Sequence, residues 1–329
     1  MKNKLRKLRL LIVGAGDVAR RLTTRIGVNE RVQWLGLARS AETSNALRQS
    51  GILPIAGDLD FSPSLKRAGA LARSAHAVLH LAPPSGEAAD DPRMKRWLAA
   101  SATPSKLGRR ETERAPSSAI KMRGVIRPTR PLRNVYVSTT GVYGDCAGER
   151  IDETRRTKPA NGRAKRRVAA ESRLRAFRSQ RFTILRAPGI YAAERLPLER
   201  LRAGTPALAT ADDVFTNHIH GDDLAHAIWL AVFRGGANRA LNVVDDGEQK
   251  MGDYFDQIAA ALGLPSPPRL PRVLLMQEVS PMLYSFMSES RRIDNARLKK
   301  ELRLRLKYPT PAALLREMKP AAALQRSLL

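Results

Sequence analysis

The sequence is poor in cysteine and in long apolar runs. Its single cysteine, Cys146, excludes an internal disulfide bond and a cysteine-rich metal site. No apolar run reaches the ~18 residues that a membrane-spanning helix needs. The first residues, MKNKLRKLRLLIVGAGDVA, have the basic start and apolar stretch of a secretory signal, but glycines and Asp17 interrupt the stretch and no cleavage site follows. These absences predict a cytoplasmic protein with no membrane partner and no bound metal.

Acidic residues are also scarce, since 31 Asp and Glu stand against 58 Lys and Arg, which gives a net charge of +27. A positive field of this size attracts polyanions such as nucleic acid. However, the basic residues are spread over the whole chain, and neither zinc-finger spacing nor an RNA-binding aromatic motif accompanies them. Specific nucleic-acid binding is therefore the weakest function class, and an anionic cofactor or substrate accounts better for the charge.

Strand-like and helix-like segments alternate along the chain. Apolar runs that end at glycine or proline predict buried parallel strands, and the segments between them predict helices, including one over 161–179. This alternation is typical of α/β proteins with right-handed crossovers. We therefore expect a Rossmann-type doubly wound parallel sheet. The predicted strands cover residues 8–14, 32–38, 51–58, 76–84, 134–140 and 181–189.

A glycine-rich turn, GAGDVA (14–19), follows the first strand and opens the first predicted helix. Gly14 permits a tight turn, and Gly16 lets a pyrophosphate approach the backbone. The helix that begins at Asp17 and Val18 presents free N–H groups to that pyrophosphate. Alanine replaces the third glycine of the usual motif, where only close helix–strand packing is needed. The turn predicts a dinucleotide site.

The ends of the following strands extend this site. The second strand closes with LARS, where Arg39 stands in place of the carboxylate that binds the ribose in NAD sites. A guanidinium binds a 2′-phosphate bidentately, whereas a carboxylate repels it. We therefore favour NADP(H) over NAD(H), although Arg39 can also be read as one solvated arginine among many. The later strand ends supply Asp58, Leu59, Leu81, Ala82 and Pro83.

The domain organisation follows from the position of this site. Residues 1–190 are expected to form an NAD(P)-binding Rossmann domain. Residues 191–329 are expected to form mainly a small, mostly helical substrate domain, with 217–246 returning to the Rossmann core. Residues 103–131 contain four prolines and little apolar periodicity, so they predict a flexible insertion, with an ordered lid as the alternative.

Seven segments between residues 8 and 310 occur in the order of a known family: GAGDVA (14–19), GDLD (57–60), VLHLAPP (78–84), STTGVYGD (138–145), ILRAPGIY (184–191), NHIHGDDLA (217–225) and LNVVDD (241–246). On these segments the chain resembles the extended or atypical short-chain dehydrogenase/reductases, the group of NAD-dependent epimerases and dehydratases. The resemblance implies a Rossmann domain and a small C-terminal domain that shapes a substrate pocket, often for a nucleotide sugar. It also adds Pro188 to the cofactor site.

The resemblance further implies a catalytic Ser or Thr, a Tyr and a Lys. The Tyr exchanges a proton while hydride moves to or from the nicotinamide, and the Lys lowers the Tyr pKa and holds the ribose. The spacing to VYG places the hydroxyl on Thr139, and Lys165 is the candidate lysine. The tyrosine is missing, because none lies between Tyr143 and Tyr191.

Two alignments of NGRAKRRVAAE (161–171) stay open. Counting back four residues from Lys165 puts Asn161 in the tyrosine position. Aligning on VAAE puts Arg163 there instead and replaces the lysine by Arg167. Neither Asn nor Arg transfers a proton near neutral pH, so the usual acid is absent in both alignments.

Other groups are candidates for the substrate pocket. Tyr143, Tyr191, His218 and His220 are weak candidates to replace the missing acid, because each has an ordinary structural role in its motif. Arg291 lies in a segment where basic residues of the family can meet a substrate phosphate. The predicted substrate-binding residues are Thr139, Tyr143, Tyr191, Asn217, His218 and Arg291.

Three function classes follow. The leading one is an NADP(H)-binding atypical reductase related to the nucleotide-sugar epimerases and dehydratases, an oxidoreductase or epimerase/dehydratase whose reaction stays open. The second is a non-catalytic dinucleotide-binding sensor that regulates a partner. The third, a nucleic-acid binder, rests on charge alone. A homodimer is compatible with all three.

Overall fold

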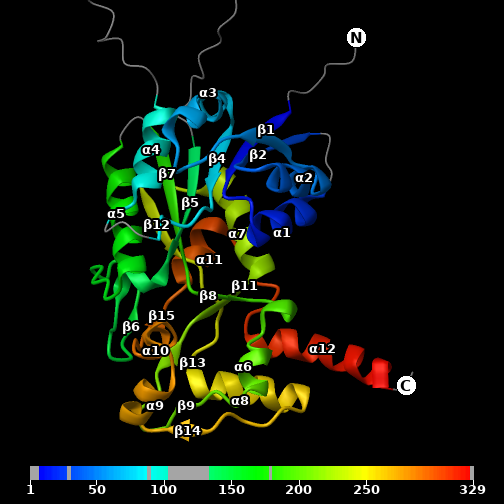
Figure 1. Cartoon of the computed structure of the whole chain (residues 1–329), viewed down its shortest axis with the longest axis vertical. Helices are drawn as coiled ribbons and strands as arrows, with labels where there is room; N and C mark the ends of the chain where they lie inside the picture. Colours follow the sequence, from blue (N-terminus) through cyan, green and yellow to red (C-terminus); the bar gives the residue numbers. More distant parts are fainter. Residues whose placement is uncertain (1–6, 28–30, 87–89, 103–132, 178–179, 327–329) are drawn as a thin grey trace, which may run out of the picture.

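The computed structural model describes residues 7–27, 31–86, 90–102, 133–177 and 180–326. Its centre is a seven-stranded parallel sheet with the strand order β12-β7-β5-β4-β1-β2-β3 (Figure 1). The order reverses between β1 and β4, the point at which doubly wound sheets bind ligands. The predicted Rossmann-type α/β fold is confirmed. The strands are β1 (Leu8–Val13), β2 (Val32–Ala38), β3 (Leu53–Ala56), β4 (Ala77–His80), β5 (Arg133–Thr139), β7 (Arg181–Ala187) and β12 (Arg239–Asn242).

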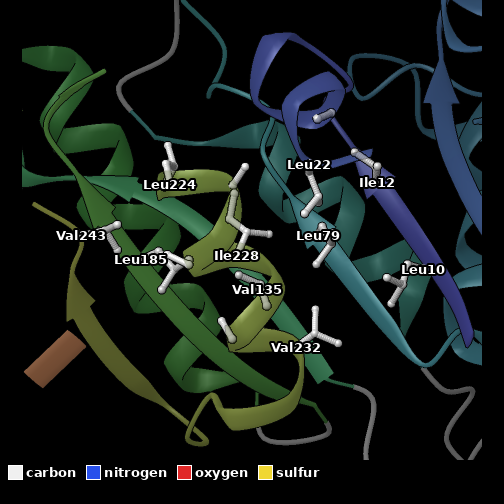
Figure 2. Packing of buried hydrophobic residues seen from close by; sticks show 14 of the residues in the cluster. Leu10, Ile12, Leu22, Leu79, Val135, Leu185, Leu224, Ile228, Val232 and Val243 are labelled. Atoms are coloured by element: carbon white, nitrogen blue, oxygen red, sulfur yellow. The ribbon is translucent and has the colours of Figure 1, made fainter. Parts of the chain in front are cut away.

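Two hydrophobic cores cover the two faces of the sheet, because successive residues of a strand point to opposite sides. In β1, Leu10 and Ile12 enter the core shown in Figure 2, whereas Leu11 and Val13 enter the core on the other face. Helices α1, α2, α7 and α11 close the first core, and α3, α4 and α5 close the second. These helices are α1 (Asp17–Ile26), α2 (Ala41–Gln49), α3 (Lys66–Ser74), α4 (Pro92–Ser101), α5 (Gly162–Ala176), α7 (Gly221–Arg234) and α11 (Ala296–Leu302).

Short elements gather beyond the carboxyl ends of the strands, in the lower part of Figure 1. β8 follows β7 after Pro188 and pairs in parallel with β11. Beyond Tyr191 the chain forms helices together with short strands, each of two to four residues, as expected. The remaining elements are η1 (Ser62–Leu65), η3 (Thr140–Tyr143), β6 (Arg150–Ile151), β8 (Gly189–Tyr191), η4 (Ala193–Arg195), α6 (Leu198–Arg202), β9 (Ala207–Leu208), β10 (Phe215–Thr216), β11 (His218–His220), β13 (Gln249–Lys250), α8 (Met251–Leu262), β14 (Arg269–Leu270), α9 (Arg272–Glu278), α10 (Pro281–Met287), β15 (Arg292–Ile293) and α12 (Pro311–Arg326).

The structure contains a helix that the sequence analysis did not predict, α4, although its start carries ordinary helix signals. The Asp91 carboxylate accepts the Met94 N–H at 3.0 Å, and Pro92 occupies the first turn. The predicted insertion over 103–131 lies outside the described residues. Within the described ranges, no helix combines the length and apolarity that would let it cross a membrane.

The two glycines of the GAGDVA turn have different structural roles. Gly14 has φ +94°, and a Cβ atom there would lie 2.3 Å from the backbone nitrogen of Ala82. That nitrogen donates to the Val13 carbonyl at 2.9 Å, so β1 and the end of β4 meet at this glycine. A Cβ atom on Gly16 would meet nothing within 4 Å. The fold requires Gly14 but leaves open space at Gly16.

Substitution by alanine should separate these two roles. Gly14→Ala should lower the free energy of unfolding by about 2–4 kcal/mol, because it combines an unfavourable positive φ with a clash against backbone. Gly16→Ala should lower it by less than about 1 kcal/mol, the usual effect of alanine at a helix N-cap. Urea denaturation of both variants provides the measurement. Equal losses would show that Gly16 is also a packing requirement.

Candidate functional site

Two cavities meet at the carboxyl edge of the sheet. The first, which we name the glycine-turn cavity, has a volume of about 440 Å³ and lies against the start of α1 and the ends of β4 and β5. The second, which we name the C-terminal cavity, has a volume of about 280 Å³ and is closed by residues between Phe215 and Arg291. The two cavities share three wall residues: Thr139, Arg163 and Pro188.

The glycine-turn cavity is favourable for an anion. Gly16 is the N-cap of α1 and no side chain caps this helix end, so its first N–H groups remain available. Three arginines and one aspartate are the charged residues of the wall. Burial opposes ionisation of Asp17, but hydrogen bonds and charges of Arg21 and Arg195 outweigh it and lower the Asp17 pKa. The three arginines are Arg163, Arg167 and Arg195.

Helix α5 carries the residues of both alignments of 161–171. Asn161 is its N-cap, and the Asn161 Oδ1 accepts the Ala164 N–H at 2.9 Å. One turn apart, Arg163 and Arg167 both line the glycine-turn cavity. Lys165 is exposed and lines neither cavity. In the alignment with Lys165, only Asn161 lines a cavity, whereas in the other alignment both Arg163 and Arg167 do.

The two arginines of α5 that line the glycine-turn cavity differ in their contacts. Arg167 is fixed, since its Nη1 donates to the Val137 carbonyl and to the Tyr136 hydroxyl, both at 2.9 Å. Arg163 lies over the Phe286 ring, 4.4 Å from its centre, and makes no hydrogen bond or ion pair with any residue that the structure describes. Partial burial, with the charges of Arg167 and Arg166, lowers the pKa of Arg163.

A buried polar network lies beneath the site. The Glu171 carboxylate of α5 accepts two hydrogen bonds from Arg186 of β7, at 2.7 and 3.1 Å, and one from Ser138 at 2.7 Å. Arg186 also donates to the Tyr143 hydroxyl at 2.8 Å, and that hydroxyl donates to Asn242 at 2.7 Å. Glu171 and Arg186 are almost completely buried. The network ties α5 to the strands that carry the cavity walls.

The histidine of the C-terminal cavity is held in its neutral form. Burial lowers the pKa of His218 to about 4, and its ring stacks on Tyr254 with 4.1 Å between ring centres. It therefore carries no charge near neutral pH. His220 caps α7 by accepting the Asp222 N–H at 3.2 Å, which is a structural role.

Residues from 289 to 291 close the same cavity. The Arg291 guanidinium donates to the Gly144 carbonyl at 2.8 Å and to the Glu289 carboxylate at 2.6 Å. Asn217 holds this segment in place, because its side chain donates to the Arg291 carbonyl at 2.9 Å and accepts the Ile293 N–H at 3.1 Å. The Asn217 amide is thus one of several groups that hold the closing segment, since the Ser290 carbonyl also accepts the Cys146 and Gly148 N–H groups at 3.1 and 3.0 Å.

Some of the predicted cofactor-binding residues lie together in the wall of the glycine-turn cavity, and others do not. Arg39, Asp58, Leu59 and Ala82 line neither cavity, and Arg39 lies exposed at the end of β2. The predicted cofactor residues that line the glycine-turn cavity are Gly14, Gly16, Asp17, Val18, Leu81, Pro83 and Pro188.

The predicted substrate residues divide in the same way. Thr139, Asn217, His218 and Arg291 line the C-terminal cavity. Tyr143 and Tyr191 do not, since both are 1% exposed and their hydroxyls are hydrogen-bonded inside the protein. Burial also raises the pKa of Tyr143, so it is a poor proton donor. The wall residues that the sequence did not indicate include Arg195, Phe286 and Glu289.

The described part of the chain contains no group of three or more His, Cys, Asp or Glu side chains placed to hold a metal ion. No protein-family model matches the sequence, and no curated protein matches it. Solved structures do match.

A conserved protein of unknown function from Silicibacter pomeroyi is 26% identical, with a TM-score of 0.72 over 95% of this chain and 99% of that one. The UDP-glucose 4-epimerase of Thermotoga maritima, solved with UDP-glucose, is 15% identical, with a TM-score of 0.69 over 96% and 99%. The dTDP-glucose 4,6-dehydratase of Bacillus anthracis, solved with NAD, is 15% identical, with a TM-score of 0.68 over 94% of each chain. The resemblance to epimerase/dehydratase-like and short-chain dehydrogenase/reductase structures is confirmed at the level of the fold, over nearly the whole chain.

The buried pair beneath the site should dominate the stability of the fold in acid. The Arg186 guanidinium holds the pKa of Glu171 below its ordinary value despite burial. A carboxyl group with a lowered folded-state pKa stabilises the fold above its unfolded-state pKa, and this contribution disappears as the pH falls through the folded-state pKa. Glu171→Gln should cost about 3 kcal/mol at pH 7 and should reduce the loss of stability below about pH 4.5.

Urea denaturation between pH 7 and pH 3 provides this measurement. Glu301→Gln is the matched control, because Glu301 pairs with Arg239 near the surface and should cost less than about 1 kcal/mol. Similar costs for the two variants at pH 7 would contradict a dominant role of the buried pair.

Proposed function

We propose that this protein binds NADP(H) in the glycine-turn cavity and a small-molecule substrate in the C-terminal cavity, as an atypical relative of the reductases and epimerases that it resembles. The observation that carries the proposal is the common wall of the two cavities, formed by Thr139, Arg163 and Pro188. A cofactor in one cavity and a substrate in the other would meet at this wall, as hydride transfer requires.

The residues of the glycine-turn cavity fit a dinucleotide. The position that a Cβ atom of Gly16 would occupy is open, so a pyrophosphate can approach the backbone there. The uncapped start of α1 and the excess of arginine over aspartate favour its negative charge. Apolar side chains line the cavity around the remainder of the dinucleotide; they are Leu81, Pro83 and Pro188. The cofactor, when bound, supplies or accepts the hydride.

The preference for NADP(H) rests on the end of β2. Arg39 is exposed and makes no hydrogen bond or ion pair with another described residue. The charge of Arg39 makes a minor contribution to the lowered pKa of Asp60, which comes chiefly from the hydrogen bonds of Asp60 with Arg93. Arg39 is therefore available for a 2′-phosphate, with Asp58, Leu59 and Ala82 at the neighbouring strand ends nearer the adenosine.

The chemistry next to the nicotinamide differs from that of the family. Arg163 occupies the place of the phenol, and a guanidinium stabilises negative charge on a substrate oxygen but does not donate its proton near neutral pH. The Thr139 hydroxyl accepts the Gly141 N–H at 3.2 Å and keeps its own proton available to orient a substrate oxygen. We therefore expect firm cofactor binding and slow reduction of ordinary carbonyl compounds.

A non-catalytic sensor is the second candidate, and Arg163 is the observation that favours it. A protein that binds NADP(H) without an acid at the nicotinamide can report the cofactor to a partner instead of using it. Slow turnover of every substrate together with firm NADP(H) binding would favour this function.

The dinucleotide preference can be reversed at one position. Wild-type protein should bind NADPH about tenfold or more tightly than NADH, and Arg39→Asp should invert that order, because attraction to the 2′-phosphate becomes repulsion. Isothermal titration with both nucleotides provides the measurement. Arg48→Asp is the matched control, since it makes the same charge change at an exposed position of α2, away from the end of β2. Equal wild-type affinities would remove the NADP(H) assignment.

The missing acid can be restored. Arg163→Tyr places a phenol one helical turn from the Arg167 cation, which favours its ionised form as the family lysine does. The variant should reduce an uncharged probe such as cyclohexanone about tenfold or more faster than the wild type, within the range of general acid–base catalysis. NADPH absorbance follows the rate, and Lys165→Ala should leave the rate unchanged. Fast wild-type turnover would show that another group already serves as the acid.

A further inference from the structure

The C-terminal cavity carries one uncompensated positive charge among its described wall residues. Its charged residues are Arg163, Glu289 and Arg291. Glu289 and Arg291 neutralise each other, since their side chains are 9% and 12% exposed and lie 2.6 Å apart. His218 adds no charge near neutral pH. The charge of Arg163 is therefore left over.

The same wall has hydrogen-bond donors without acceptors. Arg163 is exposed and makes no hydrogen bond with a described residue, so its guanidinium donors are available to a ligand in the cavity. The Asn161 oxygen is occupied by the Ala164 N–H, but no acceptor is recorded for its amide protons among the described residues. A guanidinium carries five N–H donors, and a bound anion can accept hydrogen bonds from those that have no acceptor in the protein. The arrangement calls for an acceptor with negative charge.

Phe286 helps to position this cation. The Arg163 guanidinium carbon lies over the Phe286 ring, 4.4 Å from its centre. This cation–π contact holds the guanidinium against the wall of the cavity without using its N–H donors.

The size of the cavity limits the ligand. Its volume of about 280 Å³ is just below the roughly 300–1,000 Å³ found for small-molecule sites. A nucleotide sugar is larger and brings two phosphates, whose charge exceeds the single positive charge of this wall. A small carboxylic acid matches the cavity in volume and in charge.

We propose that the C-terminal cavity binds a small monocarboxylate, such as a 2-oxo or 2-hydroxy acid, with its carboxylate on the Arg163 guanidinium. The inference names the substrate class of the proposed function, and it rests on that function for the role of the neighbouring cofactor. The position of Arg163 in the common wall places the ligand beside the glycine-turn cavity. Arg163 is then the residue that selects the substrate, in the position where relatives of this fold carry their acid.

Isothermal titration of the full-length protein tests the proposal, with and without saturating NADPH. The probes are 2-oxobutyrate and its uncharged amide 2-oxobutyramide, which have nearly the same shape, together with UDP-glucose and inorganic phosphate. The acid should bind about tenfold or more tightly than the amide, because only the acid forms the charge-assisted pair. Arg163→Met should abolish this difference. Lys165→Met, which removes the same charge from an exposed position of α5 that lines neither cavity, should preserve it.

Arg163 makes no hydrogen bond with a described residue that the substitution could break, and circular dichroism of the variant checks that it is folded. Equal binding of acid and amide, a difference that persists in Arg163→Met, or tighter binding of UDP-glucose or phosphate than of the acid would each overturn the proposal. Absence of acid binding in both titrations would also overturn it. Loss of NADPH binding with intact acid binding would instead contradict the proposed cofactor alone.

Discussion

The buried ion pair between Glu171 and Arg186 is the constraint on which the site depends. Glu171, Arg167 and Arg163 follow one another at intervals of four residues, so they lie along one side of α5. Fixing Glu171 to β7 therefore fixes Arg163, about 12 Å away along the helix axis. A buried charge that loses its partner is strongly unfavourable, so α5 has little freedom to slide or rotate on the sheet.

Much of the fold follows from local sequence signals. The apolar strands predict the sheet, because strands buried on both faces must consist mainly of apolar residues. The GAGDVA turn predicts the glycine-turn cavity, because the positive φ at Gly14 favours glycine at that position. Helix α4 also carries its signals, Asp91 and Pro92, yet it falls outside the regular alternation. The alignment at Asn161, Arg163 and Lys165 could not be decided from sequence, since it depends on which side of α5 faces the strands.

The remaining site residues depend on tertiary contacts. Phe286 and Glu289 reach the cavity from a segment more than 120 positions beyond Arg163, and no local pattern indicates that placement. The VYG motif correctly locates Tyr143 near the site, but the hydrogen bonds of its hydroxyl with Arg186 and Asn242 turn it into the interior. A motif can thus give the position of a residue on the chain without giving the direction of its side chain.

Helix α7 has a consequence for how the chain is made. The first six strands of the sheet in chain order are complete at Ala187, but α7 (Gly221–Arg234), which covers Leu10 and Ile12 with α1, is synthesised later. A nascent chain that has emerged only as far as β8 leaves part of this apolar face open to water. The protein therefore passes through a stage in synthesis at which it is prone to aggregate, and the slow appearance of α7 from the ribosome sets how long that stage lasts.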